Sequence, residues 1–288
     1  MLKEFKFRTK TLLLKLLRGK AVSAFKKAAT TPEWLDFKEL ERLKEQYPVK
    51  ITWEKYEQDS EALFTTPDHT SANKVLSSLG QNNNTLNILE LGCQHGMVSY
   101  ALKLKGHNTI GIDIDSDNFS EVAKNAGVNF SQMDASNLTF EDESFDCVFS
   151  FNAFEHMDNP EEALKEAMRV VKKGGHIYLY FNPLYMSPWG LHSWLELAIP
   201  YCQMLFPPDM IRSVVEAQHL WYCNGWSCQA YRELWKKFSS QLSILKYKEN
   251  VNPFHLDMIV RYPSCFKSKT DCFDDLVVDG IEVLFQKK

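Results

Sequence analysis

The chain has 288 residues, of which 44% are hydrophobic, so it can bury a sizeable core as one large domain or as a domain with additions. Its net charge of -4 and its pI near 6.1 exclude the globally basic surface that is typical of proteins binding nucleic acid through bulk charge. The seven cysteines include no Cys-x-x-Cys pair, which excludes the ligand spacing of a zinc ribbon. An odd number of cysteines spread through a long chain favours a reducing compartment, so we expect the protein in the cytoplasm.

The N-terminal end concentrates positive charge. Residues 1–27 contain nine lysines and arginines against one acidic residue, Glu4, which gives +8 and leaves -12 for the rest of the chain. Leucine and phenylalanine recur among these charges with helical periodicity, so residues 1–30 are predicted to form a basic amphipathic helix. Such a helix suits an anionic membrane or an acidic partner; alternatively it packs on the rest of the chain, or it is an organelle-targeting segment. Its apolar run, Leu12–Leu14, is far too short for a bilayer, which takes about 20 apolar residues.

Residues 31–85 are predicted to form a helical cap. The sequence Thr31-Pro32-Glu33 predicts a helix start, because the hydroxyl can cap the helix and proline suits the first helical position. This helix is expected to end before Pro48. A second helix is predicted over residues 71–79, closed by Gly80.

The stretch Asn87–Leu102 predicts a strand, a glycine turn and a helix. An apolar strand pattern runs into Gly92, and a helical pattern starts after Gly96. Such a turn lets a ligand approach the backbone closely, and the first N–H groups of the helix point at that ligand. A dinucleotide fingerprint needs further glycines at two positions where this chain has Gln94 and Met97, so NAD is disfavoured.

Strand and helix patterns then alternate roughly every 20 to 30 residues, which predicts a parallel sheet with helices on both faces. The second strand is predicted over residues 109–114. Asp113 stands at its end, about 20 residues beyond Gly92, where an acidic side chain can accept hydrogen bonds from both ribose hydroxyls. A third strand is predicted over residues 128–134.

A capped helix and further strands follow. The sequence Asn159-Pro160-Glu161-Glu162 predicts a helix start, and Gly174-Gly175 is predicted to end that helix. Residues 176–181 form the next predicted strand. The remaining predicted elements are a helix over residues 229–238 and strands over residues 242–247 and 279–286.

Residues 183–228 are predicted to form an insertion outside the sheet. The region 183–235 holds five of the chain's seven tryptophans together with several prolines. Because this segment leaves the carboxyl end of a strand, where open α/β sheets bind ligands, we expect it to form a lid over the substrate. Alternatively, its aromatic residues pack a helical cap or a dimer interface.

Several motifs stand in an order that is typical of one family. They are Glu90-x-Gly92-x-x-x-Gly96, Asp113, Asp134-Ala135, Glu155-His156 and Arg169-Val-Val-Lys-Lys-Gly-Gly175. In this order they resemble the class I methyltransferases, which bind S-adenosylmethionine in a Rossmann-like domain. The resemblance implies an α/β fold with a doubly wound, mostly parallel seven-stranded sheet and an antiparallel edge strand. To this fold the chain adds the N-terminal helical extension and the aromatic-rich lid, and the methyltransferase domain is expected over residues 86–288.

The resemblance implies S-adenosylmethionine as the cofactor and supplies candidate residues for it. Asp113 is expected to bind the ribose, and the exit of the third strand at Asp134 is expected to bind the adenine edge. Gln94 departs from the family, in which glycine is usual at this position. The candidate cofactor-binding residues are Glu90, Gly92, Cys93, Gly96, Asp113, Ile114, Asp134, Ala135 and Phe151.

Three histidines are candidate bases. Methyl transfer chiefly requires that the acceptor be aligned behind the methyl group and that water be excluded, and a hydroxyl acceptor is also helped by a base. His156 is the first candidate because its segment leaves the fourth strand at the same carboxyl edge as Gly92; alternatively this histidine only fixes its loop. His192 and His219, both in the insertion, are secondary candidates.

No essential metal is expected. In ubiquinone-type O-methyltransferases, a related Glu-x-x-Glu-His pattern binds a divalent metal. Here Glu155 and His156 keep the last two ligands, but Asn152 replaces the first one.

The sequence therefore predicts an S-adenosylmethionine-dependent methyltransferase that acts on a small-molecule or glycan-type acceptor, at oxygen. No nucleic-acid partner is expected, and residues 1–27 are the candidate membrane contact. One alternative is a binding or scaffold protein that keeps the fold without catalysis, which Gln94 favours; another is an NAD-linked oxidoreductase. The intact motif residues Glu90, Asp113 and Asp134 favour the enzyme.

Overall fold

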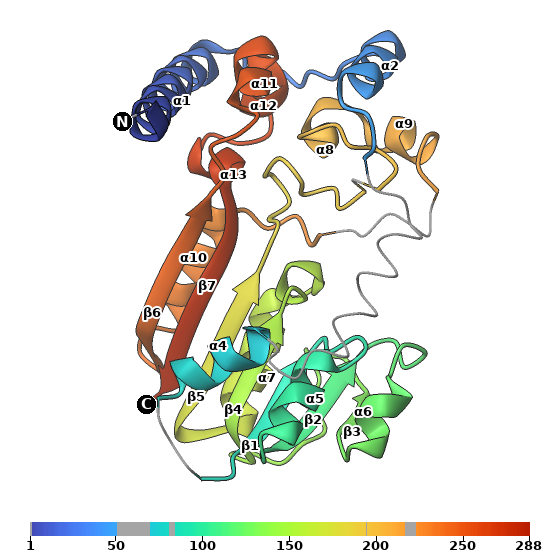
Figure 1. The fold of residues 1–288 in the computed structure, drawn as a ribbon, viewed down its shortest axis with the longest axis vertical. Coiled ribbons are helices and arrows are strands. Elements are labelled where there is room, and N and C mark those ends of the chain that lie inside the picture. The colour runs from blue at the N-terminus through green and yellow to red at the C-terminus, as the bar shows by residue number, and fades with distance from the viewer. Residues whose placement is uncertain (1, 51–69, 81–83, 194, 217–222) are drawn as a thin grey trace. The chain divides into compact units, whose positions relative to one another are not determined.

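The computed structural model describes residues 2–50, 70–80, 84–193, 195–216 and 223–288, with the side chains of the first helix described from Leu13 onward. The chain folds into two units (Figure 1). Unit 1 comprises Met1–Ile51, Pro183–Ala230 and Asn250–Asp279, and unit 2 comprises Thr52–Asn182, Tyr231–Glu249 and Gly280–Lys288. The segment predicted as an insertion therefore belongs to the same unit as the N-terminal residues and the residues before the last strand.

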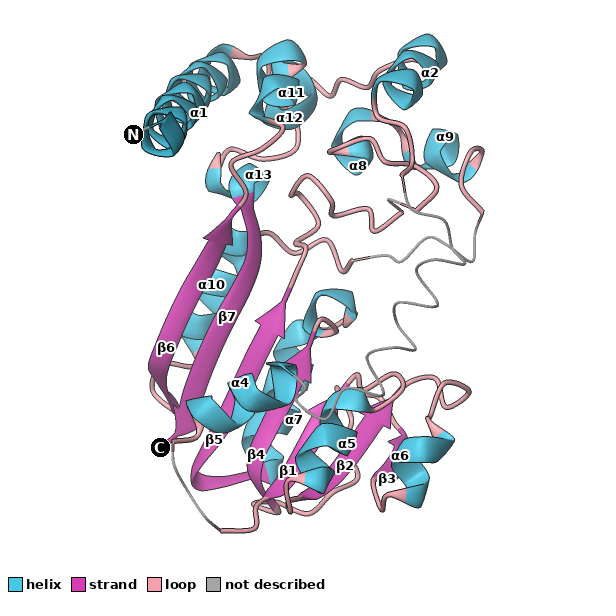
Figure 2. Cartoon of the chain, in the orientation of Figure 1, coloured by secondary structure: helices cyan, strands magenta, loops and turns pink. Residues whose placement is uncertain are grey.

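Unit 2 is built on a seven-stranded sheet, drawn in magenta in Figure 2. The strands are β1 (Asn87–Leu91), β2 (Asn108–Asp113), β3 (Asn129–Gln132), β4 (Phe145–Phe151), β5 (Val171–Phe181), β6 (Leu242–Val251) and β7 (Val278–Lys287). Their order is β3-β2-β1-β4-β5-β7-β6. Strands β1 to β5 pair in parallel, and β7 pairs antiparallel to β5. The predicted mostly parallel, seven-stranded sheet is confirmed.

The register of the parallel strands places their carboxyl ends at one edge of the sheet. Leu91 of β1 lies opposite Ile112 of β2, so the residues that follow these two strands leave the sheet side by side. Phe151, the last residue of β4, lies opposite Tyr180 of β5. This edge is where open α/β sheets bind ligands.

Helices cover both faces of the sheet, as the doubly wound prediction requires. The helices of this unit are α4 (Thr70–Ser78), α5 (Met97–Leu104), α6 (Glu121–Asn125), η1 (Phe154–His156), α7 (Pro160–Val170) and α10 (Cys228–Lys237), the last of which starts in unit 1. Tyr178 and Phe181 of β5 point to opposite faces because side chains alternate along a strand. Tyr178 shares a core with Val75 of α4. Phe181 contacts Tyr231 of α10, with the ring centroids 4.8 Å apart.

The end of α7 differs from the prediction. The helix begins as expected, with Asn159 as its N-cap, but it ends at Val170 and not at Gly174-Gly175. Both glycines lie inside β5, because Val171 already pairs with the sheet and the register shifts before His176. Gly174 has a φ of +74°, which suits this irregularity in the strand. Strand β5 therefore begins five residues earlier than predicted, and the remaining predicted elements after residue 70 agree with the structure to within four residues at each end.

Unit 1 is helical and has a core of its own. Its helices are α1 (Leu2–Lys27), α2 (Phe37–Gln46), α8 (Cys202–Leu205), α9 (Pro208–Arg212), α11 (Leu256–Arg261), α12 (Pro263–Lys267) and α13 (Asp274–Val277). Their buried residues include Phe25 of α1, Leu40 of α2 and Phe266 of α12, together with Tyr201 just before α8. Among the helices in the described residues, none has the length and apolar character needed to cross a membrane.

The start of α2 also differs from the prediction. The helix begins at Phe37 and not at Pro32, and Asp36 is its N-cap, with a side chain that accepts the Glu39 N–H at 2.9 Å. Leu35 donates its N–H to the carbonyl of Leu205 at 2.9 Å. This bond from outside the helix holds the preceding residues in a non-helical conformation, so the second available capping residue is the one used.

Candidate functional site

The turn between β1 and α5 is shaped by two glycines. Gly92 has a φ of +67° and Gly96 a φ of +73°, both in the region that favours glycine. A Cβ at Gly92 would lie 2.4 Å from the Cβ of Ala153, and a Cβ at Gly96 would lie 2.3 Å from the ring of Phe130. The chain's own packing therefore requires glycine at both positions.

Cys93 contributes its backbone to this turn. Its N–H donates to the carbonyl of Ile112 at 2.9 Å, and its carbonyl accepts the N–H of Gly96 at 2.7 Å. The thiol is buried, and burial raises the pKa of Cys93 above its ordinary range. Cys93 is therefore a packed, neutral residue that fixes the turn against β2.

Glu90 is buried beneath the turn and holds the start of α5. Its side chain is 3% exposed. The carboxyl Oε2 accepts the N–H of Ser99 at 3.0 Å and the hydroxyl of Ser99 at 2.6 Å. Burial raises the pKa of Glu90 to about 8, and the hydrogen bonds from Ser99 only partly oppose this. The structure gives Glu90 a positioning role for α5; a direct contact with a cofactor stays a prediction.

Asp113 links the exit of β2 to the turn after β1. Its Oδ2 accepts the N–H of Gln94 at 2.8 Å, and its Oδ1 accepts the N–H of Asp115 at 3.2 Å. Gln94 has a φ of +48°, the left-handed conformation for which glycine is best suited. Ile114, the next residue along the chain, is 72% exposed. The edge thus offers a carboxylate and an adjacent apolar surface.

Asp134 and Ala135 follow β3 at the same edge. Met133 donates its N–H to the carbonyl of Asp113 at 2.8 Å, which keeps the two strand exits together. The Oδ1 of Asp134 accepts both the N–H and the hydroxyl of Ser136, each at 2.8 Å. Asp134 is exposed and Ala135 is half-buried.

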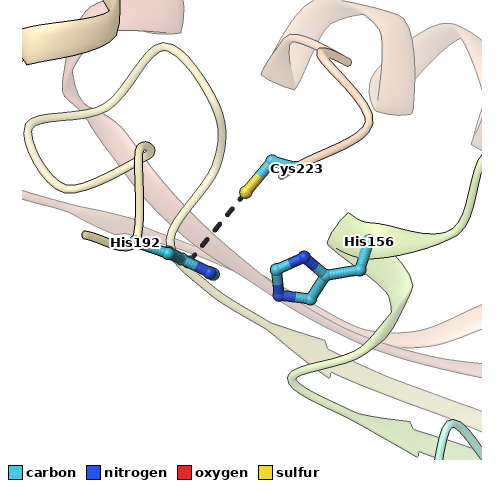
Figure 3. Close-up of side chains that lie close together, drawn as sticks. All are labelled: His156, His192 and Cys223. Carbon is cyan, nitrogen blue, oxygen red and sulfur yellow. Dashed lines mark hydrogen bonds between the residues drawn. The ribbon is translucent and has the colours of Figure 1, made fainter. Parts of the chain in front are cut away.

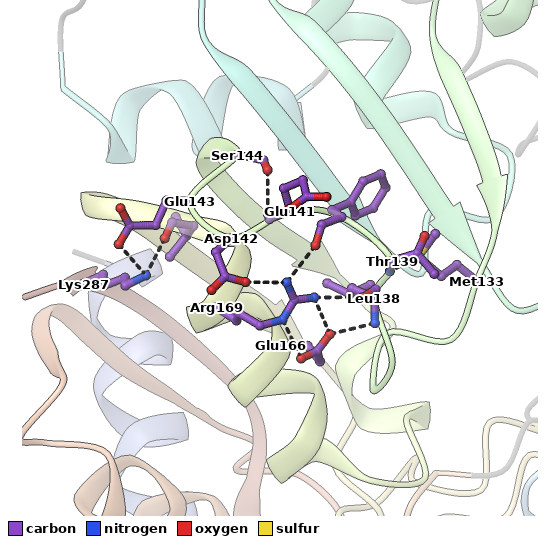
Figure 4. Close-up of polar contacts among 12 residues, drawn as sticks. Met133, Leu138, Thr139, Glu141, Asp142, Glu143, Ser144, Glu166, Arg169 and Lys287 are labelled. Carbon is purple, nitrogen blue, oxygen red and sulfur yellow. Dashed lines mark hydrogen bonds and ion pairs between the residues drawn. The ribbon is translucent and has the colours of Figure 1, made fainter.

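The loop after this exit is fixed by Arg169 of α7, which the sequence analysis did not single out (Figure 4). The guanidinium donates to the carbonyls of Leu138 at 2.8 Å and Phe140 at 2.7 Å, and to Asp142 at 2.8 Å. The carboxylate of Glu166 accepts a hydrogen bond from Arg169 and another from the backbone N–H of Leu138, each at 2.8 Å. Arg169 is therefore a positioning residue for the loop next to Asp134, and its place in the motif before Gly174-Gly175 was the only sequence signal for it.

Phe151 ends β4 in an aromatic cluster. Its ring lies 5.7 Å from Tyr178 and 5.1 Å from Tyr180, measured between centroids. The ammonium group of Lys74 lies 4.4 Å from the centroid of the Tyr180 ring. Phe151 is half-buried, so part of its ring stays accessible at the sheet edge.

The residues after β4 bring a buried carboxyl group and a histidine together in η1. Glu155 is 1% exposed, and neither of its carboxyl oxygens makes a hydrogen bond within the described residues. Burial raises the pKa of Glu155 to about 8, although the nearby backbone N–H groups of Glu155 and Asn182 lower it slightly. His156 is half-buried, and its backbone N–H donates to the carbonyl of Ala153 at 2.9 Å. Its role as a base stays a prediction.

His192 lies in unit 1, where its partner is a cysteine that the sequence analysis did not single out. His192 is 9% exposed and has a φ of +59°. Its Nε2 lies 3.9 Å from the Sγ of Cys223 (Figure 3), which also lies 3.5 Å from the carbonyl of Pro183. His156, drawn in the same figure, belongs to unit 2. The third candidate base, His219, lies outside the described residues.

The residues at the carboxyl edge of unit 2 fit a cofactor that contains adenosine. Gly92 and Gly96 shape the turn before α5, and the carboxylate of Asp113 lies beside it, at the strand exit where open α/β sheets bind ribose. Ile114 offers an exposed apolar surface for a base, next to the polar exit at Asp134. These features belong to neighbouring parallel strands, so one ligand can contact all of them.

The comparisons with known proteins concern the same part of the chain. Residues 89–179 match a family model described as a methyltransferase domain. A ubiquinone biosynthesis O-methyltransferase of Coxiella burnetii (strain Dugway 5J108-111) is 29% identical over 97 residues, covering 32% of this chain and 41% of that protein. The mitochondrial ubiquinone biosynthesis O-methyltransferase of Dictyostelium discoideum is 24% identical over 147 residues, covering 40% of this chain and 46% of that protein.

Among solved structures, the PH0226 protein of Pyrococcus horikoshii OT3 is similar over 78% of this chain and 95% of that chain, with 19% identity and a TM-score of 0.49. The chain spans less than half the length of the two curated relatives. The family match begins inside β1 and ends inside β5, so it contains the glycine turn, Asp113 and Glu155-His156. Residues 89–179 of this chain are therefore a methyltransferase domain, as the family model describes it.

Proposed function

We propose that this protein transfers a methyl group from S-adenosylmethionine to an oxygen atom of a small-molecule or glycan-type acceptor. The observation that carries the proposal is the carboxyl edge of unit 2, where the turn 92–96, the carboxylate of Asp113 and the exposed side chain of Ile114 follow neighbouring parallel strands. The two curated relatives are named as O-methyltransferases, which supports oxygen as the acceptor atom. The proposal includes a cytoplasmic location and no nucleic-acid partner, in keeping with the net charge of -4.

Each residue at this edge has a proposed role toward the cofactor. The backbone of the turn 92–96 would approach the cofactor closely, and Asp113 would accept hydrogen bonds from the ribose hydroxyls. Ile114 and Ala135 would contact the adenine, and Asp134 would accept a hydrogen bond at its edge. When bound, S-adenosylmethionine supplies a methyl group made electrophilic by the sulfonium. The chain's own residues then align the acceptor, exclude water and take up the acceptor proton.

His156 and His192 are the proposed proton acceptors, with His219 as a third. An imidazole titrates near neutral pH, so it can take the proton that the acceptor hydroxyl loses during the reaction. Each histidine is to be replaced singly by alanine, and acceptor turnover is to be compared with cofactor affinity. A true base should lose on the order of 10²-fold or more in turnover while cofactor affinity holds. If all three variants keep near-normal turnover, no general base is used and alignment alone carries the reaction.

The segment 183–228 is the proposed acceptor-recognition region. Its described aromatic residues include Tyr185, Trp189 and Trp226, which are all half-buried and so keep part of each ring accessible. Aromatic faces suit the apolar faces of sugar rings and of aromatic acceptors, which supports a glycan-type or aromatic compound. Contact with a membrane surface through residues 1–27 stays a further proposal.

The test uses the full chain and an extract of the source cells. The extract is incubated with the protein and S-adenosylmethionine, and mass spectrometry searches for compounds that gain the mass of one methylene unit. A compound that appears only with active protein identifies the acceptor. Calorimetry on the same protein should show binding of S-adenosylmethionine and none of NAD; the opposite result would refute the proposal.

One observation favours a second candidate, a protein that keeps the fold and the cofactor but not the catalysis. Gln94 occupies a left-handed position where the family usually has glycine, so this turn departs from the pattern at the point nearest the ligand. Tight binding of S-adenosylmethionine without methylation of any compound in the extract would select this second candidate.

A further inference from the structure

Helix α1 carries two apolar stripes, and they have different surroundings. Ala21 and Phe25 are 0% and 2% exposed in the core of unit 1, and Leu17 packs against the same core. Leu13 and Leu16, in contrast, are 66% and 58% exposed. Residues three or four apart share a side of a helix, whereas neighbouring residues are about 100° apart around its axis. Leu13 stands four residues before Leu17 and three before Leu16, so it borders both stripes, and its exposure together with that of Leu16 marks the uncovered side of α1.

The exposed stripe lies among positive charges. From Leu13 to its end at Lys27, α1 contains five basic residues and no acidic residue. The basic residues are Lys15, Arg18, Lys20, Lys26 and Lys27. The guanidinium of Arg18 lies 3.9 Å from a carboxylate oxygen of Asp274. The four lysines form no ion pair with any residue that the structure describes. Lys20 follows Leu16 by one helical turn, so charge and apolar surface share this side of the helix.

We infer that this exposed side of α1 docks on the surface of an anionic phospholipid bilayer. Two exposed leucines provide apolar surface that can enter the boundary between headgroups and acyl chains, while the lysines are attracted to anionic headgroups. The described part of α1 does not qualify as a membrane-spanning helix, so it lies along the surface. The opposite charge of the remaining chain, -12 against +8 for residues 1–27, directs the attraction to this helix.

The docking does not require unit 1 to open. The stripe that packs in the core is held by its own contacts, among them an edge-to-face contact of Phe25 with Phe273 at 5.7 Å between ring centroids. Leu13 and Leu16 are not part of that core. The lipid surface therefore binds a side of the helix that folding has left uncovered.

The experiment is co-sedimentation of the full chain with lipid vesicles. Vesicles of phosphatidylcholine alone are compared with vesicles that also contain phosphatidylglycerol. The protein should sediment with the anionic vesicles and stay in the supernatant with the neutral ones. Raising the salt concentration from about 0.1 M to about 1 M should release it, because salt screens the charges. The variant Leu13→Ser/Leu16→Ser should bind the anionic vesicles at least about ten-fold more weakly, because the inserted apolar surface is gone.

The matched control removes two exposed apolar side chains of similar size elsewhere. Ile244 and Leu245 of β6 are 47% and 52% exposed, so Ile244→Ser/Leu245→Ser should keep wild-type vesicle binding. Circular dichroism and thermal unfolding of both variants show that each one is folded. The inference is wrong if the wild type stays in the supernatant, if it binds both kinds of vesicle equally, or if Leu13→Ser/Leu16→Ser binds like the wild type. Calorimetry with S-adenosylmethionine on the same proteins reports on the proposed function independently.

Discussion

The turns after β1 and β4 each have a buried glutamate beside them, and the two glutamates differ in their partners. Glu90, next to the first turn, is 3% exposed, and its Oε2 accepts two hydrogen bonds from Ser99. Glu155, in the second turn, is 1% exposed, and neither of its oxygens makes a hydrogen bond within the described residues. Burial raises the pKa of both carboxyl groups to about 8.

The carboxyl group of Glu90 therefore stabilises the fold of the first turn, whereas the carboxyl group of Glu155 is not used by the fold of the second turn. A buried polar group without a hydrogen bond costs about 1–3 kcal/mol, so Glu155 lowers the stability of its own turn. Groups of this kind gather at functional sites, and Glu155 stands next to the candidate base His156. Glu90, in contrast, caps α5 and has its hydrogen bonds satisfied within the fold.

The largest expected effect is that of Gly96→Ala in the first turn. The positive φ costs about 1 kcal/mol for alanine, and the contact of the new Cβ with the Phe130 ring at 2.3 Å adds about 1–3 kcal/mol. The matched control is Gly80→Ala, because Gly80 has a φ of +78° but no atom of the described residues within 4 Å of its would-be Cβ. Urea unfolding should show a clearly larger loss for Gly96→Ala. Equal losses would mean that close packing does not constrain the turn.

The second effect tests the unpaired carboxyl directly. The pKa of Glu155 in the folded chain is raised from 4.5 to about 8, so between these pH values the carboxyl group ionises more readily in the unfolded chain. The free energy of unfolding is therefore highest at low pH and falls as the pH rises through this window. Glu155→Gln is neutral at every pH. The fall in unfolding free energy between pH 5 and pH 8 should therefore be smaller in the variant, by about 2–4 kcal/mol. Urea unfolding at both pH values checks this, and an unchanged fall would show that the pKa of Glu155 is not raised.

A smaller loss is expected from Asp113→Ala, which acts on cofactor binding. Removing hydrogen bonds to a charged group costs about 1.5–3 kcal/mol, so S-adenosylmethionine should bind about 10- to 150-fold more weakly in calorimetry. Asp117→Ala is the control, because Asp117 is exposed in the loop that follows β2. Unchanged affinity in Asp113→Ala would show that Asp113 does not hold the ribose.

The smallest effect is expected from Gln94→Gly. With a φ of +48°, glutamine is in a conformation that glycine adopts freely, so the variant should gain up to about 1 kcal/mol in stability. Cofactor affinity should stay equal or increase, because the backbone can approach the ligand more closely. Loss of binding in a folded variant would mean that the Gln94 side chain contacts the cofactor and that the departure from the family is functional.

Local patterns in the sequence were enough to predict the strands and the glycine turn. The strand residues, Gly92, Gly96 and Asp113 carry their information within a few neighbours, and the parallel register then brings them to one edge. The start of α2 was predicted wrongly because two capping residues compete, Thr31 and Asp36. The choice between them depends on a hydrogen bond from Leu35 to Leu205, which no local pattern contains.

The rest of the site depends on contacts between distant residues. Arg169 fixes a loop whose carbonyl groups lie about 30 positions earlier in the chain, and backbone carbonyl groups leave no trace in residue identity. That Glu155 has no hydrogen-bond partner among the described residues is likewise visible only once its surroundings are folded. The pairing of His192 with Cys223 joins two ends of the insertion, and only the histidine was predicted.

The assembly of unit 1 from three separate stretches has a consequence for synthesis on the ribosome. The partners of the buried stripe of α1 include Leu256, Phe266 and Phe273, which are made long after α1 itself. In this interval, Ala21 and Phe25 lack these partners. A nascent chain in which this apolar and basic helix is still uncovered has a prolonged opportunity to meet chaperones or lipid before its own core closes. Helix α1 is thus open to contacts with other molecules before its contacts with the core of unit 1 can form.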